Sequence, residues 1–177
     1  MNATINREIA LLRWSFNLAK KSGKLNLVPV LPSKLAESNV RKGFFKREDF
    51  LRHREALPPA FKPVTTFAYW TGCRKEEILS LRWSQVDLEE RAVRLEVGET
   101  KNDDARTIPL AGELLEMLRM QKQIRNSKWP GCPWLFFRNG KRIKSIRGAW
   151  DAACVAAGLV DENGDAVRLL HDLRRTI

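Results

Sequence analysis

The sequence predicts an α+β fold that is mainly helical and contains one small three-stranded antiparallel sheet. Two observations lead to this prediction. Apolar residues recur every three or four positions along most of the chain, which is the spacing that gives an α-helix one apolar face. In the middle of the chain, three short strand-like runs follow one another with polar turns between them. A composition of 44% apolar and 30% charged residues is that of an ordinary globular protein.

The first predicted element is an amphipathic helix over residues 4–20. Its apolar positions are Ile5, Ile9, Leu12, Phe16 and Ala19. A lone helix of this length is marginal in water, so we expect its apolar face to have a partner. Residues 22–42 contain Gly23, Pro29 and Pro32 without sustained periodicity, which predicts a linker.

A second unit is expected to begin at residue 43 with three helices. Residues 46–56 form the first, with Phe50 and Leu51 facing inward and prolines ending it. Residues 60–70 form a buried second helix, which includes Trp70 and breaks at Thr71 and Gly72. The third covers residues 75–83, whose first turn is acidic, as the helix dipole favours.

The predicted sheet follows these helices. Its strands are expected at residues 86–88, 92–97 and 106–110. A helix over 111–124 comes next, followed by a turn and a buried aliphatic and aromatic run over 129–136. The last elements are a helix over 145–158, closed by Gly158, and the start of another helix at 171–177. The six tryptophans are expected to serve packing rather than base stacking.

Charge gives the first indication of a partner. Lysine and arginine number 32 against 21 acidic residues, so the net charge is +11 and association with polyanions is favoured. Nucleic acid is the leading partner, and a merely basic protein is the alternative. The basic stretch 41–54 suits either a DNA backbone or solvent, and the run 141–147 is expected to be a solvated face.

Metal, disulfide and membrane sites find little support in the sequence. Cys73, Cys132 and Cys154 show no C-x-x-C pairing, and only His53 and His171 could join them as ligands. We therefore expect no metal site and no cofactor, and cysteines that act as small, partly buried apolar residues. No apolar run approaches the roughly 20 residues of a membrane span, and no secretory signal is evident, so the expected compartment is the cytoplasm.

Four basic side chains stand at positions suited to phosphate chemistry: Arg74, Lys101, His171 and Arg174. Guanidiniums bind phosphoryl oxygens bidentately, a lysine can protonate a leaving oxygen, and a histidine can assist proton transfer. Each residue also has a structural alternative. Arg74 could pair with Glu76 or Glu77, Lys101 could be a polar hairpin tip, His171 could be a buried structural residue, and Arg174 or Arg175 could be surface charges.

Taken in order, these residues resemble a known family. The chain contains Thr-Gly-x-Arg at 71–74, a Leu-x-Trp helix end at 81–83, Thr-Lys-Asn at 100–102, a strand ending in Pro-Leu, and His-x-x-Arg at 171–174. This order is similar to the catalytic domain of the tyrosine recombinases, the phage-integrase type of site-specific recombinase. The resemblance implies cleavage and rejoining of double-stranded DNA through a phosphotyrosine, without metal or cofactor, for DNA integration and recombination of mobile elements.

The resemblance also implies roles and domains. Arg74 and Arg174 would hold the scissile phosphate, Lys101 would protonate the departing 5′ oxygen, and His171 would act as an acid/base or hydrogen-bonding partner. Residues 1–21 would be the last helix of a truncated DNA-clamping (core-binding) domain, 22–42 a linker, and 43–177 a truncated catalytic domain. Other recombinase protomers would be partners, since the family works as a tetramer on DNA, and a bacterial or phage-type protein would be nucleoid-associated when bound.

The sequence departs from the family at its nucleophile. The family's tyrosine follows the His-x-x-Arg motif near the carboxyl end, whereas these residues end at Ile177, and the only tyrosine, Tyr69, lies in an apolar segment. We therefore expect a DNA-binding member of the family that is inactive alone. The alternatives are a non-catalytic DNA-binding module that competes with or complements an intact recombinase, and a metal-dependent nuclease or RNA-binding protein sharing only the charge.

Overall fold

A computed structural model describes residues 2–37, 43–95 and 105–174 of the chain. The chain divides into two compact units, Met1–Lys42 and Gly43–Ile177. Each unit is described below by itself. None of the described helices is both long and apolar enough to cross a membrane.

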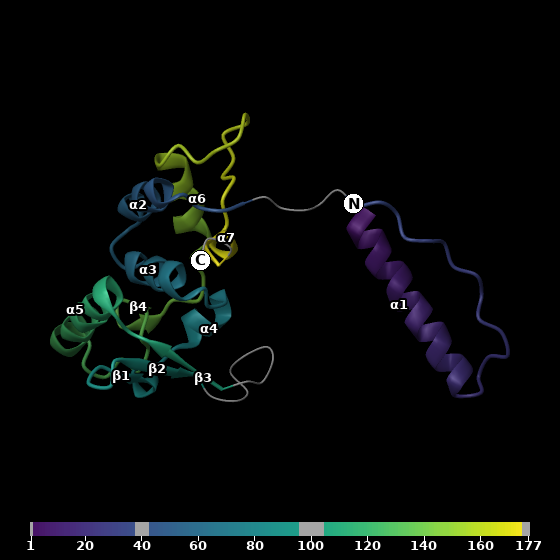
Figure 1. The fold of residues 1–177 in the computed structure, drawn as a ribbon, viewed down its shortest axis with the longest axis horizontal. Helices are drawn as coiled ribbons and strands as arrows, with labels where there is room; N and C mark the ends of the chain where they lie inside the picture. Colours follow the sequence, from purple (N-terminus) through teal and green to yellow (C-terminus); the bar gives the residue numbers. More distant parts are fainter. Residues whose placement is uncertain (1, 38–42, 96–104, 175–177) are drawn as a thin grey trace. The chain divides into compact units, whose positions relative to one another are not determined.

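The first unit is one long helix with a segment that returns along it (Figure 1). Helix α1, Asn2–Lys21, confirms the predicted amphipathic helix, but Asn6 is its only buried residue in the described structure. The Asn6 side chain donates to the Leu35 carbonyl and accepts from the Leu35 N–H, both at 2.9 Å. Leu11 and Trp14 are mostly exposed, so polar contacts rather than apolar packing hold the returning segment.

The second unit contains six α-helices in its described residues. They are α2 (Arg47–Ala56), α3 (Lys62–Thr71), α4 (Lys75–Ser80), α5 (Gly112–Lys128), α6 (Arg147–Ala156) and α7 (Leu170–Leu173), with a 3-10 turn, η1, at Trp83–Gln85. They lie where the apolar spacing predicted helices, although α4 ends before Trp83. Helix α4 stops early because the Leu81 N–H already bonds the Ile78 carbonyl three residues back, which tightens the last turn.

The predicted three-stranded sheet is present. Strands β1 (Val86–Asp87), β2 (Ala92–Leu95) and β3 (Arg106–Pro109) pair antiparallel in the order β1-β2-β3. Val93 lies opposite Ile108 and Leu95 opposite Arg106. Because residues directly opposite each other share a face, the side chain of Arg106 lies on the same face as buried Leu95.

A second, two-stranded sheet was not predicted from the sequence. Strands β4 (Phe137–Arg138) and β5 (Lys141–Arg142) pair with Phe137 opposite Arg142. The turn between them is Asn139–Gly140, and both residues have positive φ, 52° and 72°. Asn-Gly is the favoured pair for such a turn, so the sequence contains a hairpin signal even though the two strands are too short to show alternation.

One apolar core holds the second unit together. Its largest fully buried side chains include Phe50, Phe67, Leu118, Phe136 and Trp150. Two expectations about the core were wrong. Leu51 is 39% exposed and Trp70 is 49% exposed. In α2 the inward residues are Phe50 and His53, three positions apart on one face, and the Trp70 indole instead donates a hydrogen bond to Glu113 at the surface.

Candidate phosphate-binding site

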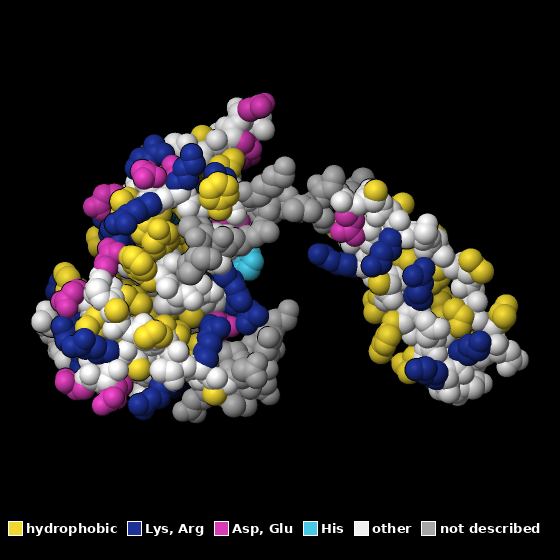
Figure 2. Space-filling model, in the orientation of Figure 1, with side chains coloured by type: hydrophobic (Ala, Val, Ile, Leu, Met, Phe, Trp, Pro, Cys, Tyr) yellow, Lys and Arg dark blue, Asp and Glu magenta, His cyan; other side chains and the backbone are white. Residues whose placement is uncertain are grey.

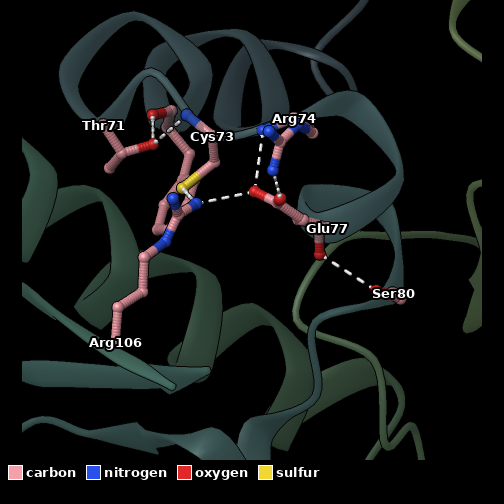
Figure 3. Close-up of polar contacts among 7 residues, drawn as sticks. Thr71, Cys73, Arg74, Glu77, Ser80 and Arg106 are labelled. Atoms are coloured by element: carbon pink, nitrogen blue, oxygen red, sulfur yellow. Dashed lines mark hydrogen bonds and ion pairs between the residues drawn. The ribbon is translucent and has the colours of Figure 1, made fainter. Parts of the chain in front are cut away.

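A sharp turn after α3 places Arg74 at the start of α4. Gly72 ends α3 with φ at 59°, a left-handed conformation that glycine adopts without strain. The Thr71 hydroxyl lies 2.7 Å from the Phe67 carbonyl, to which it donates, and accepts from the Cys73 N–H at 3.3 Å (Figure 3). The Thr-Gly sequence therefore stops one helix and starts the next, with Arg74 as the residue that caps α4.

Glu77 on α4 holds two arginines in place. Its side chain is only 4% exposed. One carboxylate oxygen accepts from the Arg74 guanidinium at 2.9 Å, while the other accepts from the Arg74 backbone N–H at 2.9 Å and from the Arg106 guanidinium at 2.6 Å (Figure 3). The ion pair between Arg74 and Glu77, expected as the structural alternative to phosphate binding, is thus present. It holds the Arg74 side chain in place but leaves it partly exposed.

The electrostatics of this cluster leave a positive site. Burial would raise the pKa of Glu77, but hydrogen bonds from Arg74 and the charge of Arg106 hold that pKa below its ordinary value. The carboxylate is therefore ionised at neutral pH. One negative charge faces two guanidiniums whose side chains remain 30% and 38% exposed, so both can also bind an anion from solvent.

Arg106 is a member of this cluster that the sequence analysis did not single out. Its guanidinium also approaches the Cys73 sulfur at 3.2 Å. The sequence does indicate that Arg106 faces the core. Arg106 and buried Ile108 are two positions apart in β3, and two-residue spacing puts side chains on the same face of a strand. A basic residue on a core-facing position needs an acidic partner, and Glu77 supplies it.

His171 is held at the surface by helix α7. The buried Asp172 carboxylate accepts the Leu169 N–H at 2.8 Å at the start of this helix, and Leu173 is fully buried beneath it. His171, which directly precedes these two buried residues, is exposed. Gly43 packs so closely that a Cβ there would lie 2.6 Å from the Asp172 carboxyl carbon. A side chain at position 43 would therefore collide with the carboxylate at the start of α7.

Helices α4 and α7 and strand β5 border a common hollow of about 480 Å³. The side chains that line it are Arg74, Lys75, Glu76, Glu77, Ser80, Arg142 and His171. Two of the four predicted site residues, Arg74 and His171, thus come together although they are far apart in the sequence. Arg174 ends α7 and is half-buried, and Lys101 lies outside the described residues. In Figure 2 a histidine side chain (cyan) is visible beside lysine and arginine side chains (dark blue).

The described residues provide no metal centre. They contain no group of three or more His, Cys, Asp or Glu side chains placed to hold a metal ion. Cys73, Cys132 and Cys154 are free and buried, whereas the sequence predicted partial burial. Burial raises the pKa of the Cys73 thiol and raises that of Cys154 to about 11, so neither is a thiolate at neutral pH. The chemistry that this site supports is anion binding by fixed guanidiniums with a histidine beside them.

Tyr69 lies in the core region rather than in the hollow. Its ring stacks on Phe50 with centroids 3.8 Å apart and meets Trp70 edge-on at 5.4 Å. It is one of the partly buried residues packed against the apolar core. This placement supports the packing role that the sequence assigned to it.

Comparison with known proteins decides the family. The sequence model described as "Phage integrase family" matches residues 49–177. The chain belongs to the phage integrase family. This integrase-family chain is 34% identical over 185 residues to the prophage integrase IntF of Escherichia coli K12 and 28% identical over 181 residues to the integrase of Salmonella phage P22. Each alignment covers 94% of the chain but only 36% and 43% of the relative, so the chain spans less than half of their length.

Solved structures show that the fold is shared. A lambda integrase tetramer bound to a Holliday junction superposes with a TM-score of 0.77 at 22% identity, covering 98% of this chain and 52% of that chain. The XerA recombinase gives a TM-score of 0.62 at 21% identity, covering 98% of this chain and 66% of that one. The predicted recombinase fold and the family resemblance are therefore confirmed.

Proposed function

We propose that this chain binds double-stranded DNA and holds a phosphodiester in the hollow between α4 and α7. The observation that carries the proposal is the convergence of Arg74 and His171 on that hollow, with Arg74 fixed by a buried carboxylate. A preorganised guanidinium needs no rearrangement when a phosphate arrives, which makes it an effective anion site. The family relatives, some solved on DNA, and the net charge of +11 support the same partner.

The proposed roles follow the family motif. Arg74 and Arg174 hold the scissile phosphate and stabilise the charge of its transition state. Lys101 protonates the departing 5′ oxygen, and His171 exchanges a proton or donates a hydrogen bond at the same phosphate. These steps require no metal and no cofactor. Residues 1–21 are proposed as the last helix of a DNA-clamping domain, 22–42 as a linker and 43–177 as catalytic domain.

Strand cleavage needs a nucleophile, and Tyr69 does not fit that role. It is the only tyrosine among the 177 residues, and its ring is stacked in the apolar packing around Phe50. We propose that these residues bind DNA without cleaving it on their own. Loss of a nucleophile that works as part of a unit lowers the rate by about a millionfold. A covalent adduct at Tyr69, trapped by phenol extraction and located by mass spectrometry, would contradict this.

Other recombinase protomers are the second proposed partner, because solved family structures include lambda integrase dimers and tetramers on DNA. As a non-catalytic module, the chain would compete with or complement an intact recombinase. Adding it to a cleavage-competent family member should change that enzyme's rate or products on its own site. An unchanged rate and product pattern would remove this second function. The place of action would be the cytoplasm, at the nucleoid.

DNA binding is tested directly by fluorescence anisotropy of a labelled 30-base-pair duplex over a series of salt concentrations. The logarithm of affinity should fall with the logarithm of salt, by about 0.9 per phosphate neutralised. Arg74→Ala should reduce the slope by about 0.9. Arg119→Ala is the matched control, because Arg119 also pairs with a glutamate three residues away, Glu116, but at an exposed position of α5. A flat salt dependence of the unsubstituted protein would contradict DNA binding.

A further inference from the structure

Arg142 is held rigidly beside the proposed phosphate site. It lies on β5, opposite Phe137, whose side chain is buried. Its Nε donates a hydrogen bond to the Leu79 carbonyl at 2.8 Å. Its guanidinium carbon lies 4.9 Å from the centroid of the Trp134 ring, which is a cation-π contact. These two contacts fix the side chain before any ligand is bound.

The charge of Arg142 has no acidic partner among the described residues. Arg74 and Arg106 share Glu77, whereas the ion pairs found in the described ranges do not include Arg142. Its Nε is occupied by Leu79, which leaves the two terminal nitrogens of the guanidinium. Arg142 lines the same hollow of about 480 Å³ as Arg74 and His171, so an uncompensated guanidinium borders the site.

A neighbouring arginine shows that stacking on Trp134 alone does not place a charge in the hollow. The guanidinium carbon of Arg82 lies 4.8 Å from the same ring centroid. Arg82 is exposed, and it is not among the residues that line the hollow in the described structure. The two arginines share one aromatic platform but differ in their access to the site.

We propose that Arg142 is a further phosphate-binding residue, which contacts a DNA backbone phosphate in the hollow that it shares with Arg74 and His171. This inference rests on the proposed binding of DNA. A guanidinium whose geometry is already set loses little side-chain freedom on binding, and it can donate two hydrogen bonds to phosphate oxygens. The basic run 141–147, expected from its sequence to be a solvated face, thus contributes one half-buried member to the site.

The test uses the full chain and the same labelled duplex, and compares salt slopes. Arg142→Ala should lower the slope by about 0.9 relative to the unsubstituted protein, which is the effect of one phosphate contact. Arg142→Gln is the second variant, because its amide can still reach the Leu79 carbonyl while the charge is absent. It should show the same loss. Arg82→Ala is the matched control and should keep the full slope.

Thermal unfolding followed by circular dichroism establishes that each variant is folded at the assay temperature. If Arg142→Ala does not fold, Arg142→Gln carries the test. Unchanged slopes for the folded Arg142 variants would overturn the inference while leaving DNA binding intact. An equal loss in Arg82→Ala would also overturn it, because the effect would then be general surface charge. A flat slope for the unsubstituted protein would instead show that the proposed function itself fails.

Discussion

Glu77 and His53 are both buried titratable side chains of the second unit, yet their surroundings differ completely. Glu77 is met by the guanidiniums of Arg74 and Arg106. His53 is met by aromatic rings, with centroids 4.1 Å away for Trp150 and 5.8 Å away for Phe45. The arginines around Glu77 stabilise its negative charge, whereas the aromatic rings around His53 disfavour a positive charge on the imidazole. Glu77 therefore belongs to the candidate site, because two opposite charges converge on it, whereas His53 belongs to the aromatic packing.

The pKa values follow the same division. Burial lowers the pKa of His53 below 6.5, opposed by its hydrogen bond with the Trp150 carbonyl at 3.3 Å. His53 is therefore neutral at pH 7 and joins α2 to α6 as a packing residue. Glu77 keeps its charge because the arginines offset the cost of its burial. One residue stabilises the unit and the other positions the side chains that we propose to bind phosphate.

The largest effect is expected from removing the aromatic partner of His53. Trp150→Ala should lower the free energy of unfolding by about 3–5 kcal/mol, because it deletes a fully buried ring and leaves a cavity. Urea unfolding at pH 7 measures this. Trp14→Ala, at an exposed position on α1, is the control and should change stability far less. A loss for Trp150→Ala as small as that expected for Trp14→Ala would show that the aromatic cluster adds little to the stability of the unit.

Removing the Glu77 carboxylate should lower stability less than Trp150→Ala does, and it should also weaken DNA binding. Glu77→Ala leaves two guanidiniums without their carboxylate, and we expect a loss of about 1–3 kcal/mol because both remain partly solvated. Arg74 is then no longer held at the hollow, so duplex affinity should also fall. Glu116→Ala, which removes the exposed partner of Arg119, is the control for both measurements. Unchanged duplex affinity in Glu77→Ala would show that Glu77 is not needed to hold Arg74 in a phosphate-binding position.

Acid should destabilise the unit in two separable pH windows. His53 has a lowered pKa, so the unfolded chain takes up a proton first and stability falls as pH drops below about 6.5. Glu77 also has a lowered pKa, so its contribution is complete above its ordinary value of 4.5 and is lost as pH falls through the lower folded value. Chemical unfolding at a series of pH values measures both.

Two variants assign these windows. His53→Phe should flatten the dependence just below pH 6.5, and Glu77→Gln should flatten it below pH 4.5. Each variant should leave the other window in place, because the two groups have separate partners. A pH dependence that both variants leave unchanged would mean that other groups cause the acid sensitivity.

The smallest expected effect comes from Arg106→Lys. A lysine keeps the charge beside Glu77 but cannot contact Cys73 and Glu77 with one planar group, so the loss of stability should be below about 1 kcal/mol. Differential scanning calorimetry can resolve a shift of this size. A loss as large as that of Glu77→Ala would show that Arg106, and not Arg74, is the main partner of the carboxylate.

The sequence predicted most of the fold because its elements are local. Helical spacing located α1, α3 and α5, and alternation located the strands, since both patterns depend only on neighbouring residues. The inward face of α2 was partly misassigned, because Leu51 is the more apolar residue while His53 lies on the buried side. The Asn139–Gly140 hairpin was missed because each of its strands has only two residues.

The site was predicted in part for a different reason. Arg74 and His171 were found through motifs, and the structure brings them to one hollow. Arg106 and Arg142 have no motif, and their importance depends on contacts with Glu77 and Trp134 that only the folded chain creates. The roles of Lys101 and Arg174 stay predictions.

The close approach of Gly43 to Asp172 has a consequence for the whole unit. Any side chain at position 43 would have to displace the carboxylate that caps α7, because no space separates the two. The helix that carries His171 would then shift, although Gly43 does not itself line the hollow. A substitution at Gly43 can therefore alter the alignment of His171 without changing any residue that lines the hollow.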